Sequence, residues 1–102
     1  MSFGLSEKTV SSICAILGQH PEIDRAIIYG SRAKGNYRSG SDIDLTLVGA
    51  DLSYDDLLQI MRELDESPIP YKVDLSILHY IEDAFVRDHI ERRGQLFYQR
   101  AT

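Results

Sequence analysis

The sequence predicts a small α/β domain in which helices pack on one side of a mixed β-sheet. Two patterns favour it: in some segments apolar residues recur at helical spacing, and in others they form short β-branched runs or alternate with polar residues. The segments follow one another as helix, strand, strand, helix, strand, helix, an order typical of layered folds. With 102 residues, the chain is long enough for one such unit, so we expect a single domain over 1–102.

The first half of the chain carries one predicted helix and two predicted strands. Ser6 is a suitable N-cap for a helix that ends near Gly18. Residues 25–29 form a short, almost wholly apolar run, typical of a strand buried on both faces. A polar, glycine-bearing loop follows over 30–41. Residues 42–48 then alternate polar with apolar, which predicts a strand with one face on the core and two carboxylates on the other.

The second half repeats the pattern. A second helix begins after Ser53, with acidic residues in its first turn that suit the helix dipole, and ends at the first of two closely spaced prolines. Residues 71–78 alternate again and predict a third strand. Residues 81–93 predict a third helix with basic residues at its C-terminal end. We expect the tail, 95–99, to dock as a short strand or a turn.

Composition excludes several classes of function. A net charge of −5 argues against wrapping duplex nucleic acid through a general positive surface. No apolar stretch approaches the roughly 20 residues of a membrane helix, and no secretory signal pattern is visible. Cys14 is the single cysteine, so an internal disulfide is excluded and a cytoplasmic location is expected. The three histidines share no metal-site spacing and are expected at the surface: His20, His79 and His89.

Acidic residues on two predicted strands indicate a metal site. Asp42 and Asp44 are two residues apart on one strand, so their side chains share a face about 6–7 Å apart along the backbone. No Lys or Arg lies within 39–46 to neutralise them, which favours a bound cation. Asp74 joins them if its strand pairs beside theirs. Three carboxylates suit Mg²⁺ or Mn²⁺ rather than zinc; the alternative interpretation is a solvated strand face.

The loop after the first strand indicates a phosphate site. Gly30 lets backbone approach a ligand closely, and Ser31 supplies a hydroxyl. Arg32, Lys34 and Arg38 place cations, and no acid, between Gly30 and the carboxylates. The local charge is therefore positive in an acidic chain. The alternative is an ordinary glycine turn with solvated charges; neither the P-loop nor the dinucleotide fingerprint is present.

Together, Gly30-Ser31-Arg32-Ala33-Lys34-Gly35 and Ser41-Asp42-Ile43-Asp44-Leu45 resemble the motifs of the polymerase-β-like nucleotidyltransferase superfamily. Within it the chain is similar to the minimal nucleotidyltransferases (MNT) that pair with HEPN-domain proteins in toxin–antitoxin modules. The resemblance implies a palm-like core. It also implies that Gly30 and Ser31, with Arg32 and Lys34, bind a nucleoside triphosphate, and that Asp42, Asp44 and Asp74 ligate two Mg²⁺ or Mn²⁺ ions and carry catalysis.

The resemblance further implies a reaction and a partner. We expect transfer of AMP from ATP to a hydroxyl, most simply a tyrosine, of a HEPN toxin, which would make this chain the antitoxin. Two alternatives stay open: a non-catalytic antitoxin that neutralises its partner by binding, and nucleotidyl transfer to a small molecule or RNA. No membrane partner is expected, and the sequence leaves the oligomeric state open, a homo- or hetero-oligomer included.

Overall fold

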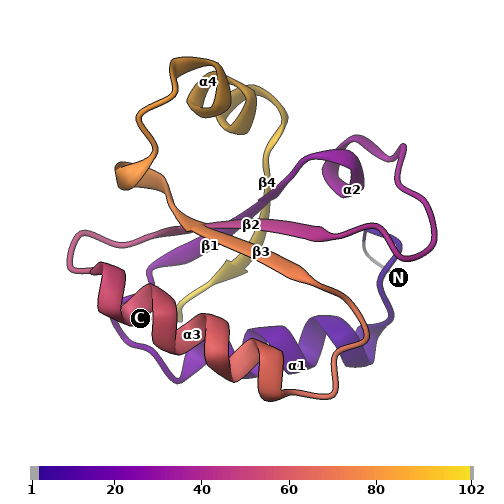
Figure 1. The fold of residues 1–102 in the computed structure, drawn as a ribbon, viewed down its shortest axis with the longest axis horizontal. Coiled ribbons are helices and arrows are strands. Elements are labelled where there is room, and N and C mark those ends of the chain that lie inside the picture. The colour runs from indigo at the N-terminus through magenta and orange to yellow at the C-terminus, as the bar shows by residue number, and fades with distance from the viewer. Residues whose placement is uncertain (1–2, 102) are drawn as a thin grey trace.

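A four-stranded sheet forms the centre of the computed structural model, which describes residues 3–101 (Figure 1). The elements are α1 (Glu7–Gly18), β1 (Arg25–Tyr29), α2 (Ser31–Lys34), β2 (Ile43–Val48), α3 (Tyr54–Glu66), β3 (Val73–Ile77), the 3-10 turn η1 (Leu78–Tyr80), α4 (Ala84–Arg93) and β4 (Gln95–Gln99). The predicted mixed sheet is confirmed. None of the helices within the described range is long and apolar enough to cross a membrane.

Strand order decides which residues meet. The order is β3-β2-β1-β4, with β2 parallel to β3 and antiparallel to β1. β2 is therefore an inner strand, and Ile43, Leu45 and Leu47 on its core face are fully buried. The tail forms a strand, β4, that pairs antiparallel with β1. The second and third predicted strands pair as β2 and β3, which meets the condition set for Asp74 to lie beside Asp44.

Side-chain caps set where the two long helices begin. The Ser6 side chain accepts a hydrogen bond from the Thr9 backbone N–H at the start of α1. Ser53 and Asp56 form a reciprocal capping box at the start of α3. Both helices lie on the same side of the sheet (Figure 1). Their buried residues close the core against β1 and β2: Ile13, Leu17, Ile60 and Leu64.

α4 departs from the expectation that every helix packs on one side. It lies across the opposite face of the sheet from α1 and α3 (Figure 1). Ile90, only 2% exposed, anchors it, while Phe85 is 88% exposed. The helix also begins later than expected, at Ala84, because the Asp83 side chain caps it. One buried anchor is all that this polar helix offers, so it covers its face of the sheet only in part.

The partial cover explains a second difference. Residues 25–29 were expected to be buried on both faces, but burial alternates along β1. Ala26 and Ile28 face the main core and are fully buried, whereas Ile27 and Tyr29 on the α4 side are only half-buried. The sheet therefore presents one closed face and one partly open face, and the open face carries the candidate site.

Candidate functional site

Two of the three aspartates occupy neighbouring positions on parallel strands. Asp44 of β2 is the register partner of Asp74 of β3, and paired strands lie about 4.8 Å apart. Ile43 and Leu45, on either side of Asp44, point into the core. Side chains alternate along a strand, so Asp44 points to the open face. Asp44 is half-buried and Asp74 is exposed.

Asp42 lies just outside the strand that was expected to contain it. β2 begins at Ile43, and Asp42 is the exposed last residue of the preceding loop. It still lies two residues before Asp44, close enough for its charge to act on that carboxyl. The loop position gives Asp42 more freedom than a strand residue would have.

Burial and the negative charge of this cluster both raise the pKa of Asp44. Burial raises the pKa of Asp44 above its ordinary value, and the negative charges of Asp74 and then Asp42 raise it further. His89 of α4 acts in the opposite direction. Within residues 3–101, none of the three aspartates forms an ion pair with Lys or Arg. The cluster therefore concentrates uncompensated negative charge at one edge of the sheet.

The donor chemistry fits a hard divalent cation. The cluster offers carboxylate oxygens, which Mg²⁺ and Mn²⁺ prefer, and the raised pKa of Asp44 shows that positive charge would be stabilising there. The three aspartate side chains were expected to converge on one point, but in this structure they are not yet gathered there. Among residues 3–101 no three His, Cys, Asp or Glu side chains are already gathered as a ligand set. Like charges repel, and the exposed Asp42 and Asp74 side chains can rotate toward a shared ion.

The glycine turn packs directly against this cluster. Gly30 has φ 77° and ψ −154°, a region essentially restricted to glycine. A Cβ at this position would collide with the Oδ2 of Asp44. The register explains the proximity, because Tyr29, the residue before Gly30, is the β1 partner of Asp44. Gly30 is therefore needed both for its backbone conformation and for the close approach of the turn to a carboxylate.

Ser31 and Lys34 begin and end the short helix that follows. Ser31 is half-buried and lies next to Gly30, so its place beside the turn is fixed by the backbone. Lys34 is exposed and lines a pocket on the α4 side of the sheet. Both positions are compatible with contact to an anionic ligand that reaches the carboxylates.

Arg32 has contacts that differ from its expected phosphate role. Its side chain is buried, with the residue only 3% exposed. The Nε and Nη2 groups donate to the Ser41 carbonyl at 3.1 and 2.7 Å, and Nη1 donates to the Phe3 carbonyl at 3.0 Å. The guanidinium also lies over two aromatic rings, those of Tyr37 at 5.2 Å and Tyr71 at 4.8 Å.

These contacts make Arg32 a clamp for the loop that carries a carboxylate. Ser41, which accepts two of its hydrogen bonds, immediately precedes Asp42. The guanidinium points inward, where two backbone carbonyls accept its hydrogen bonds and two aromatic rings lie against it. In this structure the Arg32 guanidinium is thus occupied by backbone carbonyls and aromatic rings, and its expected contact with phosphate stays a prediction.

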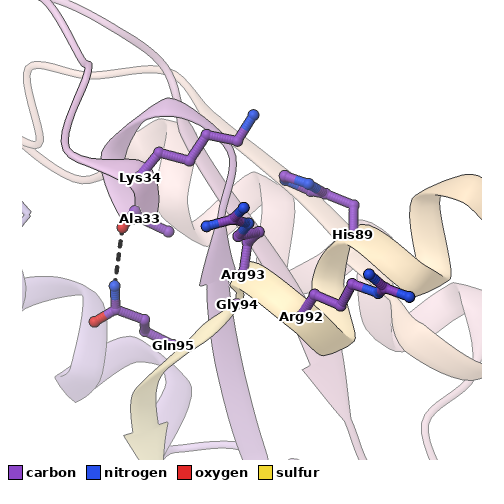
Figure 2. A pocket seen from close by; sticks show the side chains of 7 residues that line it. All are labelled: Ala33, Lys34, His89, Arg92, Arg93, Gly94 and Gln95. Atoms are coloured by element: carbon purple, nitrogen blue, oxygen red, sulfur yellow. Dashed lines mark hydrogen bonds between the residues drawn. The ribbon is translucent and has the colours of Figure 1, made fainter.

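The pocket beside the site contains residues that sequence reasoning missed. It measures about 560 Å³ and lies between α2, the C-terminal end of α4 and the start of β4 (Figure 2). Its lining residues are Ala33, Lys34, His89, Arg92, Arg93, Gly94 and Gln95. The paired arginines were visible as the basic last turn of a helix, but nothing local to them indicated that α4 lies beside α2.

Two ring-bearing residues connect the pocket with the carboxylates. His89 meets the ring of Tyr29 edge-on, with ring centroids 6.3 Å apart. Burial raises the pKa of the Tyr29 phenol, an interaction with Ser76 lowers it, and the charges of Asp44 and Asp74 raise it further. His89 was expected to be an ordinary surface residue; instead it lies half-buried between the pocket and the acidic edge.

Comparisons with known proteins agree with this geometry. The family model described as "Polymerase beta, Nucleotidyltransferase" matches residues 11–102. No curated protein matches the chain significantly.

Several solved structures share the fold. A chain in a crystal structure of a toxin–antitoxin complex with AMP-PNP is 22% identical, with TM-score 0.73, over 88% of this chain and 73% of that one. A chain in a toxin–antitoxin structure named MntA-HepT is 19% identical, with TM-score 0.69, over 92% and 73%. A chain in the complex of a tri-AMPylated Shewanella oneidensis HEPN toxin with its MNT antitoxin is 18% identical, with TM-score 0.70, over 93% and 73%. With the family model covering all but the first ten residues, this chain belongs to the polymerase β nucleotidyltransferase family.

Proposed function

We propose that this chain transfers AMP from ATP to a tyrosine hydroxyl of a HEPN-domain toxin and thereby acts as its antitoxin. The observation that carries the proposal is the packing of the Gly30 turn against Asp44, whose register partner is Asp74. A backbone turn suited to phosphate and a pair of carboxylates thus meet at one edge of the sheet. The proposal also places the chain in the cytoplasm, where ATP is supplied.

Two of the similar structures support the choice of nucleotide and acceptor. One is a toxin–antitoxin complex with AMP-PNP, an ATP analogue, and another contains a HEPN toxin that carries AMP groups beside its MNT antitoxin. Their identity to this chain is low, so they support the proposal through a shared fold. The exposure of Asp42 and Asp74 adds to it, because an acceptor on a separate protein can reach them from solvent.

The proposed chemistry assigns a task to each side chain. Asp42, Asp44 and Asp74 would hold two Mg²⁺ or Mn²⁺ ions, which neutralise phosphate charge and lower the pKa of the attacking hydroxyl. The Gly30 backbone and Ser31 bind the triphosphate, and Lys34 adds positive charge. The acceptor oxygen attacks the α-phosphorus, the bond to the β-phosphate oxygen breaks, and pyrophosphate leaves. The hydroxyl proton passes to the Asp74 carboxylate, which is exposed to solvent.

The test mixes the purified chain with ATP, Mg²⁺ and a HEPN-domain protein encoded beside it. The partner should gain the mass of AMP, and the gain should disappear with EDTA or in the Asp42→Asn/Asp44→Asn variant. A matched control, Asp51→Asn/Asp65→Asn, removes the same charge from exposed positions outside the site and should retain transfer. Silencing of the partner without added mass would overturn the proposal and favour neutralisation by binding alone.

A further inference from the structure

Large apolar side chains are exposed on η1 and in the first turns of the helices α3 and α4. Five residues belong to this group, which we call the η1 surface: Tyr54, Leu58, Tyr80, Phe85 and Val86. Phe85 is 88% exposed and Tyr54 is 59% exposed. Within residues 3–101 seven large apolar side chains are exposed in all, so most of them belong to the η1 surface.

Hydrogen bonds join the three segments that carry these residues. The Tyr80 hydroxyl donates to the Leu52 carbonyl, just before α3, at 3.2 Å. The Arg87 Nη1 donates to the carbonyls of Leu78 and Ile81 at 2.9 and 3.2 Å. The first bond ties η1 to the start of α3, and the other two tie α4 to η1. The η1 surface is therefore built on one connected part of the fold.

The η1 surface lies away from the carboxylates of the candidate site. Asp44 is near the start of β2, which runs four residues further, about 13 Å, before it ends at Val48. α3 begins beyond that end of the strand. In Figure 1 the start of α3 and the chain that follows β3 lie on one side of the molecule, and α2 lies on the other. The η1 surface is thus separate from the glycine turn and its carboxylates.

Carboxylates lie among the apolar residues of the η1 surface. Residues 54–58 and 78–88 contain five Asp or Glu and a single Lys or Arg, namely Arg87, whose side chain donates to backbone carbonyls. Asp55 and Glu82 are exposed and form no ion pair within residues 3–101. This charge disfavours nucleic acid and anionic lipid, and a second copy would bring the same carboxylates together. A basic protein surface is the partner that the charge favours.

Local structure explains the position of these aromatic residues but not their exposure. The Tyr80 hydroxyl has a partner in the Leu52 carbonyl, yet the residue is 47% exposed. The Phe85 side chain has no polar atom, so its exposure forgoes burial worth about 1.5–3 kcal/mol with no hydrogen bond in return. Aromatic residues are enriched at the centres of protein–protein interfaces, inside a polar rim. Exposed rings among carboxylates are therefore typical of a docking surface.

We propose that the η1 surface docks the protein that receives AMP, through a basic part of that protein with an apolar centre. The identity of the docked protein rests on the proposed function; the presence of a docking surface at η1 does not. Docking here leaves the carboxylates free for the acceptor hydroxyl. The η1 surface then decides which protein is held for modification and takes no part in the transfer itself.

The test uses the full chain and the HEPN-domain protein encoded beside it. Calorimetry without ATP measures their association, and AMP transfer is measured at varied partner concentration. In Tyr54→Gln/Phe85→Gln, partner affinity should fall about tenfold or more and the KM for the partner should rise, while kcat and ATP affinity change less than about threefold. The control Leu96→Gln changes an exposed apolar residue of β4 and should bind the partner normally.

A second variant tests the charge and leaves the apolar residues in place. Asp55→Asn/Glu82→Gln removes two exposed carboxylates and should slow association with the partner and weaken its dependence on salt. The matched control Asp65→Asn/Glu66→Gln removes the same charge from exposed positions at the other end of α3 and should associate at the normal rate. Equal association rates in the two variants would overturn the basic character of the docked surface.

The outcomes separate the docking surface from the proposed function. Unchanged partner affinity in Tyr54→Gln/Phe85→Gln overturns the docking surface, even if AMP transfer proceeds. Weakened binding in this variant, with no added mass on a partner that the unmodified chain binds, supports the surface and overturns the proposed function. Self-association of the unmodified chain in light scattering, abolished in the same variant, would assign the surface to a second copy and overturn the assignment to a partner.

Discussion

Substitution of Gly30 by alanine should lower both the stability of the fold and the rate of AMP transfer, and the two losses can be measured separately. Gly30 combines φ 77° and ψ −154° with a backbone position at which a Cβ meets the Asp44 carboxylate. The backbone region alone costs about 1–3 kcal/mol for a residue with a side chain. The collision adds to this, because either the turn or the Asp44 side chain must move. We expect a destabilisation of about 2–4 kcal/mol in total and a large loss of AMP transfer.

Gly35 provides the matched control. It also has positive φ, 88°, but a Cβ there would have nothing within 4 Å. Gly35→Ala should therefore cost only the left-handed backbone penalty, about 1–2 kcal/mol, and should leave transfer nearly intact. The comparison isolates the contact with Asp44 from the general cost of a side chain at positive φ.

Urea unfolding and AMP transfer, measured on both variants, provide the assay. Asp44→Ala removes the atoms that the new Cβ would strike, so Gly30→Ala should destabilise less in that background than alone, by about 0.5–3 kcal/mol. Additive effects, or equal losses of transfer in Gly30→Ala and Gly35→Ala, would refute the close approach of turn and carboxylate.

Two further substitutions test the site. Arg32→Met removes three buried hydrogen bonds to backbone carbonyls and should lower the free energy of unfolding by about 2–4 kcal/mol; unchanged stability with weakened ATP binding would instead identify Arg32 as a phosphate ligand. Because the fold raises the pKa of Asp44, ionisation of this carboxyl costs stability as pH rises through the ordinary aspartate value, about 3.9. Asp44→Asn should therefore be more stable than the unmodified chain at pH 7 without metal, with the difference shrinking as pH falls toward 4; a constant difference in urea melts would contradict this.

Local patterns were enough to predict most of the sheet and its acidic edge. Residues 25–29 form β1 at the expected positions, and the alternation that includes Asp44 and Asp74 correctly predicted two strands, which the structure pairs with each other. Strand alternation is a property of a few consecutive residues, so the sequence contains it directly. The helix caps at Ser6 and Ser53 are equally local.

Features that depend on distant contacts could not be predicted in the same way. Arg32 looks like a loop cation until the carbonyls of Phe3 and Ser41 are placed around it. α4 offers one buried anchor, Ile90, too weak a pattern to say which face of the sheet it covers. Because the basic pocket joins Lys34 to Arg93, it becomes visible only after α4 has been placed beside α2.

The fate of the ATP phosphates tests the proposed nucleotidyl transfer most directly. The chain, Mg²⁺ and the HEPN partner are incubated with ATP labelled either at the α-phosphate or at the γ-phosphate, and label on the partner is measured after denaturing separation. Nucleotidyl transfer predicts that only the α-label becomes attached, with γ-label released in pyrophosphate, and that Asp42→Asn/Asp44→Asn attaches neither. Attachment of the γ-label, or no attachment of either label to a partner that is nevertheless inhibited, would contradict it.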